Sequence, residues 1–170
     1  SPAENEILYG LSKLDEALAQ EVAMGSLAPS AHIDLAMSIS VTHEGMEDLA
    51  SRYVSDVIAT HLNLQHLRVF LFNETRCRQI VEQLCPSDVA AAEVFGVNGA
   101  YGRHYSLLKA VLLLWQKAVN PQARFTFKID LDQVFDQAAL LAETGRSALQ
   151  LIANPLWGGS GLDYAGRKVD

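Results

Sequence analysis

Residues 123–135 have the sequence ARFTFKIDLDQVF, and we expect the rest of the chain to be arranged around them. Within this stretch, residues 125–129 alternate apolar side chains with threonine and lysine, which predicts a β-strand. Asp130 and Asp132 follow directly. Because residues i and i+2 of an extended backbone point to the same side, the pair is suited to hold one hard cation, Mg²⁺ or Mn²⁺. The alternative is a helix cap, with an aspartate starting a helix at residue 133.

The composition is that of a globular chain. Of its 170 residues, 49% are hydrophobic and 19% are charged, which suits a single domain with its own core. The formal net charge of −7 argues against nucleic acid as the main partner, because a phosphate backbone is bound by clustered Lys and Arg. No run of positive charge predicts binding to a membrane surface.

Cysteine usage and hydropathy bear on the compartment. Cys77 and Cys85 are the only cysteines, and neither has a metal-site spacing to histidine. They indicate reduced thiols in a cytoplasmic compartment, although one disulfide remains an alternative. The apolar residues 111–115 form too short a run for a transmembrane segment, and no signal peptide is visible. The sequence therefore predicts a cytoplasmic protein.

The N-terminal part predicts an amphipathic helix over residues 3–24, followed by a Gly-, Pro- and Ser-containing break at residues 25–30. Its apolar stripe consists of Ile7, Leu11, Leu14, Leu18 and Val22. The stripe either packs on its own domain or forms the seam of a homodimer. Residues 1–30 are thus expected to be a helix with its linker, and residues 31–170 an α/β domain.

The next part predicts a βαβ unit. Strands are expected at residues 33–41 and 67–72, and helices at residues 46–62 and 75–84. Thr42 is the expected cap of the first of these helices. The spacing fits a right-handed crossover, and hence a Rossmann-like, mostly parallel sheet flanked by helices.

The remaining elements are less uniform. Residues 89–97 fit either a short strand or a helix end, and residues 103–119 predict a long, deeply packed helix. Residues 135–142 predict a short helix that Gly145 ends, and residues 147–153 another strand. The glycine-rich tail after Ala153 carries aromatic residues, which suggests a linker or a loop over a ligand.

Two cations lie near the start of the long helix. Arg103 and Lys109 fall in its first two turns, after a loop that contains Gly99 and Gly102. A helix N-terminus with added positive charge suits a diphosphate. The alternative is that both side chains are ordinary exposed charges.

The order of these pieces over residues 33–153 resembles the GT-A glycosyltransferases, the nucleotide-diphospho-sugar transferase superfamily. In that family a first strand ends in a polar turn, here Thr42 to Glu44. A second strand ends in an acidic or amide residue that contacts the nucleotide, here Asn73 or Glu74. A basic loop and helix follow, and then a strand delivers a DxD motif, here Asp130-Leu131-Asp132.

The resemblance implies a GT-A-like fold and a divalent cation, Mn²⁺ or Mg²⁺. The chain is expected to bind a nucleotide-diphospho-sugar donor and to transfer the sugar to an unknown acceptor, which is a sugar, a lipid or a protein. Asp132 would ligate the metal, and Asp130 the metal or the ribose. Arg103 and Lys109 would share the charge of the diphosphate. The nucleoside pocket would be lined by Thr42, Glu44 and Asn73.

The chain departs from the family in two respects. The second strand ends in FNET instead of an Asp-Asp-Gly-Ser-like sequence, and only 38 residues follow Asp132. The chain is therefore a candidate fragment, truncated at the C-terminus. Asp163 is the candidate base that would take a proton from the acceptor hydroxyl.

Two other functions remain open. A nucleotidyltransferase of similar fold carries a Gly-rich loop with Arg and Lys after the first strand, which SVTHEGMED at residues 40–48 lacks. A non-catalytic α/β module that dimerises through the N-terminal helix is the alternative of a different class.

Overall fold

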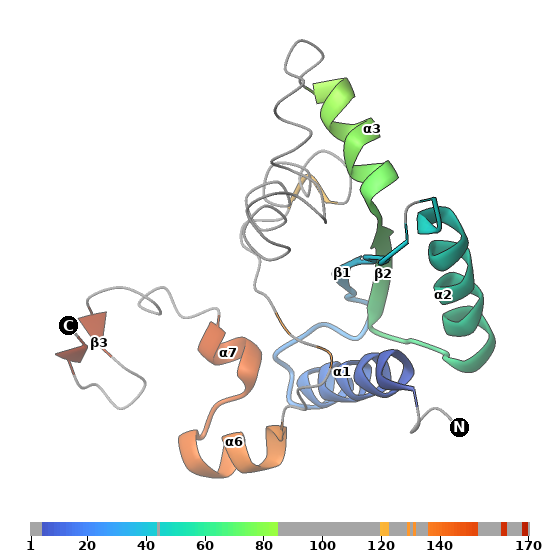
Figure 1. Ribbon diagram of the computed structural model, residues 1–170. Helices are drawn as coiled ribbons and strands as arrows, with labels where there is room; N and C mark the ends of the chain where they lie inside the picture. The colour runs from blue at the N-terminus through green and yellow to red at the C-terminus, as the bar shows by residue number, and fades with distance from the viewer. Residues whose placement is uncertain are drawn as a thin grey trace. The chain divides into compact units, whose positions relative to one another are not determined.

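The computed structural model describes residues 5–43, 45–84, 120–122, 129, 131, 136–152, 161–162 and 168–169. Figure 1 shows the elements in chain order. The chain divides into two compact units. Unit 1 comprises Ser1–His32, Leu64–Leu67 and Leu131–Asp170, and unit 2 comprises Ile33–Asn63 and Arg68–Asp130.

Unit 2 contains the expected βαβ unit. β1 (Ile33–Ser38) and β2 (Leu67–Phe72) form a two-stranded sheet, with α2 (Glu47–His61) between them in the chain and α3 (Glu74–Leu84) after β2. The backbone N–H of Ile39 donates to the carbonyl of Phe72 over 2.7 Å. Since both residues lie at the carboxyl ends of their strands, the strands run parallel. The α/β class is confirmed, whereas the larger sheet of the expected fold is not described.

A polar contact fixes the other end of this sheet. Asp34 of β1 accepts from the Nε of Arg68 of β2 over 2.7 Å. The second carboxylate oxygen of Asp34 accepts from the amide of Asn120 over 2.9 Å. Because the Asp34 side chain is buried while both of its oxygens are partnered, its charge stays compensated. The contact therefore fixes the register of the two strands.

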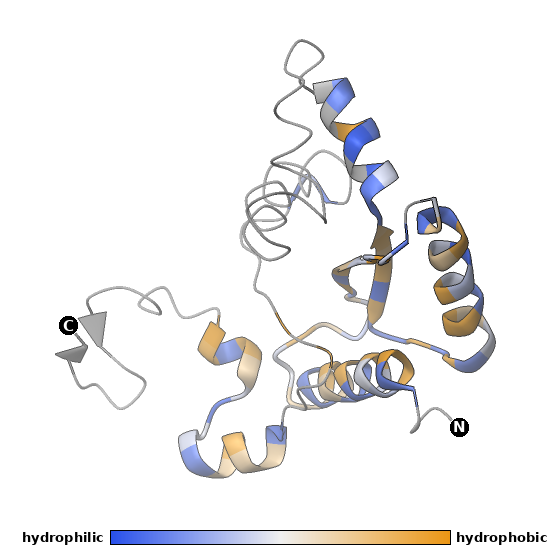
Figure 2. Ribbon diagram, viewed as in Figure 1, coloured by the Kyte–Doolittle hydropathy of each residue, from blue (hydrophilic) through white to orange (hydrophobic). Residues whose placement is uncertain are grey.

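The small core of unit 2 lies on β2. Phe72 is buried, and Ala36, Phe70 and Ile80 pack against it. Figure 2 shows β2 as mostly hydrophobic and α3 as mostly hydrophilic. α3 therefore contributes few apolar side chains, and α2, which contacts α3, adds the buried Val54.

The turn between β1 and α2 differs from expectation. β1 ends at Ser38, three residues early, and α2 follows Met46, which makes no side-chain cap. Thr42 is therefore not the helix cap. Its hydroxyl lies 3.0 Å from the Nδ1 of His43, and Gly45, with φ of +86°, turns the chain before the helix begins.

In unit 1, α1 (Glu6–Ala23) matches the predicted N-terminal helix. The side chain of Asn5 accepts from the backbone N–H groups of Ile7 and Leu8 and caps the helix. Leu11 is 0% exposed and Leu18 is also buried. Their burial within this chain supports packing on its own domain. A homodimer seam through α1 stays a hypothesis.

α1 also holds two distant parts of unit 1. The carboxylate of Asp15 accepts from the backbone N–H groups of Gln65 and His66 at 3.0 and 2.8 Å. Gly10 lies so close to Leu131 that a Cβ at this position would overlap the Leu131 carbonyl group. Leu131, the middle residue of the DxD motif, therefore lies against α1.

The C-terminal part of unit 1 corrects one prediction. α6 (Gln137–Thr144) is the expected short helix, shifted by two residues, with Asp136 as its N-cap and Gly145 at its C-cap. The strand predicted at residues 147–153 is wrong, because α7 (Ala148–Ile152) is a helix. Ser147 and Gln150 bond reciprocally to each other's backbone N–H at 3.2 and 3.0 Å, which is a capping box that starts a helix.

Within the predicted tail, β3 (Gly161–Leu162) and β4 (Lys168–Val169) pair antiparallel. The elements predicted at residues 89–97 and 103–119 lie outside the described residues, as does the strand predicted at residues 125–129 except for Ile129.

Candidate functional site

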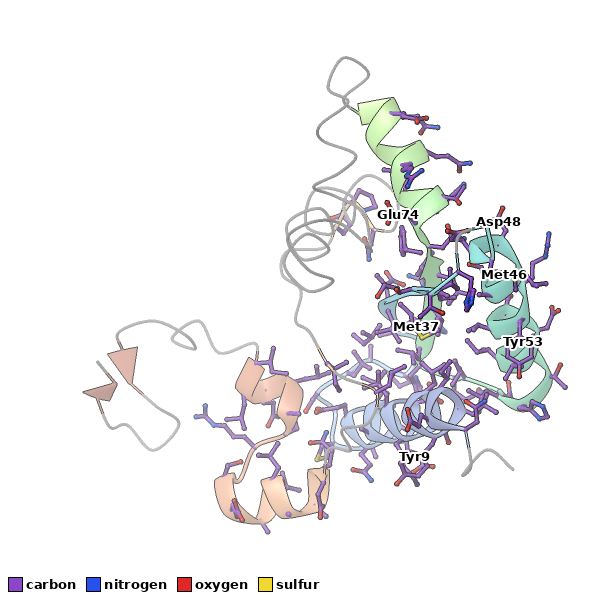
Figure 3. The ribbon with its side chains drawn as sticks, in the orientation of Figure 1. Tyr9, Met37, Met46, Asp48, Tyr53 and Glu74 are labelled. Atoms are coloured by element: carbon purple, nitrogen blue, oxygen red, sulfur yellow. The ribbon has the colours of Figure 1, made fainter. Side chains whose placement is uncertain are left out.

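Polar side chains gather at the carboxyl edge of the β1–β2 sheet. β2 ends at Phe72, and Asn73 and Glu74 follow it into α3. In Figure 3, Asp48 at the start of α2 and Glu74 at the start of α3 both lie beyond the tip of β2. This edge is where open α/β sheets place their ligands, so it is the candidate site among the described residues.

Asn73 is the centre of this edge, and its side chain is fully engaged. It is 5% exposed. Its amide nitrogen donates to Asp48 over 3.1 Å and to the hydroxyl of Ser51 over 2.8 Å, while its oxygen accepts from the backbone N–H of Arg76 over 2.8 Å. Asn73 therefore caps α3 and ties it to the first turn of α2. These contacts account for its burial without a ligand.

Glu74, the first residue of α3, is also buried. One of its carboxylate oxygens lies 3.5 Å from the Nε of Arg78, one turn further along the same helix. A negative charge in the first turn of a helix is favourable next to the helix dipole. With Glu47 and Asp48 in the first turn of α2, the edge is acidic.

Thr42 and Glu44 are the nucleoside contacts expected on the turn that follows β1. Thr42 is exposed, and its hydroxyl is paired with the ring of His43. Glu44 lies outside the described residues. The structure thus brings Asn73 and Glu74 to the sheet edge and leaves Thr42 on the turn that follows β1.

The other five predicted site residues all lie outside the described part of the chain. They are Arg103, Lys109, Asp130, Asp132 and Asp163. Leu131 is described, and its backbone lies against Gly10 of α1. Among the described residues, no group of three or more His, Cys, Asp or Glu side chains is arranged to hold a metal ion.

Asp48 and Ser51 are contributors that sequence reasoning missed. Both contact Asn73, from which they are 25 and 22 residues distant in sequence. The available signal was their spacing of three at the start of the helix that follows β1, because residues i and i+3 share one helix face. That pattern identifies the face of α2 that Asp48 and Ser51 share, but it does not identify Asn73 as the residue that they contact.

A second polar cluster lies within unit 1. Glu21 is 1% exposed, and one of its carboxylate oxygens accepts from the amide of Gln137 over 2.6 Å and from the backbone N–H of Leu149 over 3.0 Å. The amide oxygen of Gln137 accepts from Ala148 N–H over 3.1 Å. Glu21 thereby joins α1, α6 and α7. Its other oxygen has no hydrogen-bond partner in the described ranges.

The surface of α1 carries an ion pair between Lys13 and Glu16. The hydrogen bond of the Lys13 ammonium to Glu16, at 2.6 Å, raises the pKa of Lys13. Because the pair is exposed, it contributes little to stability. It is also remote in sequence from the candidate edge.

None of the helices in the described ranges is both long and apolar enough to cross a membrane. The chain was compared with protein-family models, with curated proteins and with solved structures, and none of the three comparisons found a match. Function is therefore inferred from the residues of this chain.

Proposed function

We propose that this chain is the donor-binding part of a metal-dependent glycosyltransferase, which takes its sugar from a nucleotide-diphospho-sugar. The observation that supports the proposal is the placement of polar side chains at the carboxyl ends of two neighbouring parallel strands. Asn73 and Glu74 follow β2 there, and Asp48 reaches the same edge from α2. Ligands of open α/β sheets bind at such edges.

The charge at this edge favours a donor that arrives with a cation. Glu47, Asp48 and Glu74 make the starts of α2 and α3 acidic. A diphosphate is repelled by carboxylates unless a positive charge lies between them. A divalent cation that arrives with the donor would supply this charge, and Asp130 and Asp132 are its expected ligands.

The other roles follow from the resemblance. Asp132 ligates the cation, and Asp130 contacts the cation or the ribose. Arg103 and Lys109 add positive charge beside the diphosphate. A bound cation would neutralise the charge that develops on the leaving diphosphate. Asp163 would accept the proton of the acceptor hydroxyl.

The contacts of Asn73 refine the proposed nucleoside pocket. Since its amide already has three partners, its part is to hold the starts of α2 and α3 in place. Thr42 and Glu44 are then left as the nucleoside contacts, from the turn that follows β1.

A thermal-shift panel tests the proposal. UDP, GDP, CDP and their sugars are added with and without Mn²⁺, and the melting temperature is measured. Ligand that binds only the native state stabilises it, by about 2.7 kcal/mol at a hundredfold excess over Kd. We expect one nucleotide series to raise the melting temperature only with metal. A flat panel would overturn donor binding by this chain.

Variants assign the metal to the DxD motif. Asp132→Ala should abolish the metal-dependent shift, and Asp130→Asn should reduce it less, because an amide keeps one acceptor oxygen. Glu143→Ala is the matched control, since it removes an exposed carboxylate from α6. If Asp132→Ala kept the shift with unchanged metal dependence, the motif would have been assigned wrongly.

A further inference from the structure

α2 exposes three large apolar side chains along one face. Met46, at its N-cap, Leu49 and Tyr53 are 45%, 51% and 64% exposed. They are three and four residues apart, so they share one side of the helix. Figure 3 labels Met46 and Tyr53 along α2. We call these three residues the α2 stripe.

The α2 stripe is separate from the face that α2 buries. Val54 is the buried residue of α2, and it lies about 100° around the helix from Tyr53. Ile58 lies further round on the same buried side and is half-buried. The stripe is therefore apolar surface that lies outside the described core of unit 2. Single exposed apolar residues are common, whereas several in one row indicate an interaction surface.

Charged residues border the stripe in a self-complementary order. Arg52 and Asp56 are both exposed and lie one turn apart on the same flank of the stripe. An antiparallel copy of the helix keeps this flank, so Arg52 of one helix and Asp56 of the other lie on the same side of the pair.

We propose that a second copy of this chain pairs with the α2 stripe, with the two α2 helices antiparallel and a two-fold axis at Tyr53. About that axis Leu49 meets the partner's Val57. Arg52 then lies on the same flank as the partner's Asp56, about 3 Å from it along the helix axis, given a rise of 1.5 Å per residue. The helix dipoles are also opposed, which is favourable. This pairing is independent of donor binding.

The charges favour a second copy in this orientation over a parallel one. In a parallel pair the two-fold axis runs along the helices, so Arg52 would face the other flank of the partner helix and would lose its pairing with the partner's Asp56. A stable interface usually buries about 800 Å² per partner. One helix face provides only part of such an area, so the dimer should be reversible and dependent on concentration.

Sedimentation velocity across a concentration series tests the pairing. We expect the chain to pass from monomer to dimer as concentration rises. Tyr53→Lys should weaken the dimer by about tenfold or more, because an exposed aromatic side chain at the centre of an interface is a usual hot spot. Ser55→Glu is the control on the same helix, since Ser55 is exposed and lies away from the stripe. It should leave the dimer unchanged.

A charge exchange identifies the register. Arg52→Glu and Asp56→Arg should each weaken self-association. A mixture of the two single variants should restore it, because the carboxylate introduced at position 52 of one copy then faces the guanidinium introduced at position 56 of the other. No contact within one chain can reproduce that result. Melting temperatures of each variant verify that the fold is intact.

Three results would overturn the proposal: a wild-type chain that stays monomeric over the whole series, a dimer that Tyr53→Lys leaves unchanged, or a mixture of the charge variants that does not associate.

Discussion

Asn73 has both a functional interpretation from the sequence and a structural role in the fold. Its position after the mostly apolar β2 predicts a nucleotide contact, whereas its amide is used to cap α3 and to bind Asp48 and Ser51. Because buried polar groups must be hydrogen-bonded, the three contacts are sufficient reason for an asparagine here. The residue therefore matters to the site by holding two helix starts together.

Exchanging the amide and the carboxylate tests this role. Asn73→Asp keeps a good helix cap but removes both N–H donors and places a carboxylate next to Asp48. We expect a loss of about 1–3 kcal/mol in the free energy of unfolding, measured by urea denaturation. Adding Asp48→Asn should recover much of the lost free energy of unfolding, because the amide at position 48 can then donate to the carboxylate at position 73. If the double variant lost the sum of the free energies that the two single variants lose, the contact between residues 48 and 73 would not be the cause of the loss.

Gly10 is a residue at which two effects oppose each other. In a helix, Gly→Ala normally stabilises by about 1 kcal/mol. Here the new Cβ would overlap the backbone of Leu131, and overpacking costs about 1–3 kcal/mol. We therefore expect Gly10→Ala to lower the melting temperature.

The exposed Ala19, on the same helix, provides the comparison for Gly10. Ala19→Gly reports the helix propensity alone and should lower the stability by about 1 kcal/mol. A Gly10→Ala variant more stable than the wild type would show that Leu131 does not lie against α1.

At the scale of elements, the local hydropathy pattern predicted a strand where the structure has the helix α7. Residues 147–153 are apolar and short, and periodicity does not separate a short strand from a short helix. The deciding signal was Ser147 with Gln150 three residues later, which forms a capping box. Once the helix starts, the buried Leu151 packs within unit 1. Caps thus carried more information than hydropathy at this position.

Glu21 links three helices, and its removal should loosen all of them. Glu21→Ala leaves the Gln137 amide and the Leu149 N–H without their shared acceptor, at a cost of about 1–3 kcal/mol for each buried group. Glu21→Gln keeps one oxygen for both donors and should cost less. Urea denaturation of the two variants is the measurement. Equal losses would mean that the hydrogen bonds are not what Glu21 contributes.

At the scale of the whole molecule, the net charge makes a prediction about partners. A formal charge of −7 repels nucleic acid, whose non-specific binding depends on Lys and Arg contacts to phosphates. Fluorescence anisotropy with labelled single-stranded RNA and duplex DNA should therefore show no binding at physiological salt. Saturable binding that weakens as salt rises would contradict this.

The sequence by itself determined the local elements of this protein. A short, nearly all-apolar run predicted β2 at residues 67–72, the apolar period predicted α1 and α2 within a few residues, and Gly145 marked the end of α6. These features depend on neighbours a few positions apart, so the sequence displays them directly.

The tertiary structure decided which elements meet. Gln137 lies 116 residues from Glu21 along the chain, yet their side chains are hydrogen-bonded, and Leu131 is seated on Gly10. A period in the sequence identifies the apolar face of a helix but contains no information on what covers it. For this reason α1 was open to two interpretations until the burial of Leu11 and Leu18 supported packing within its own unit.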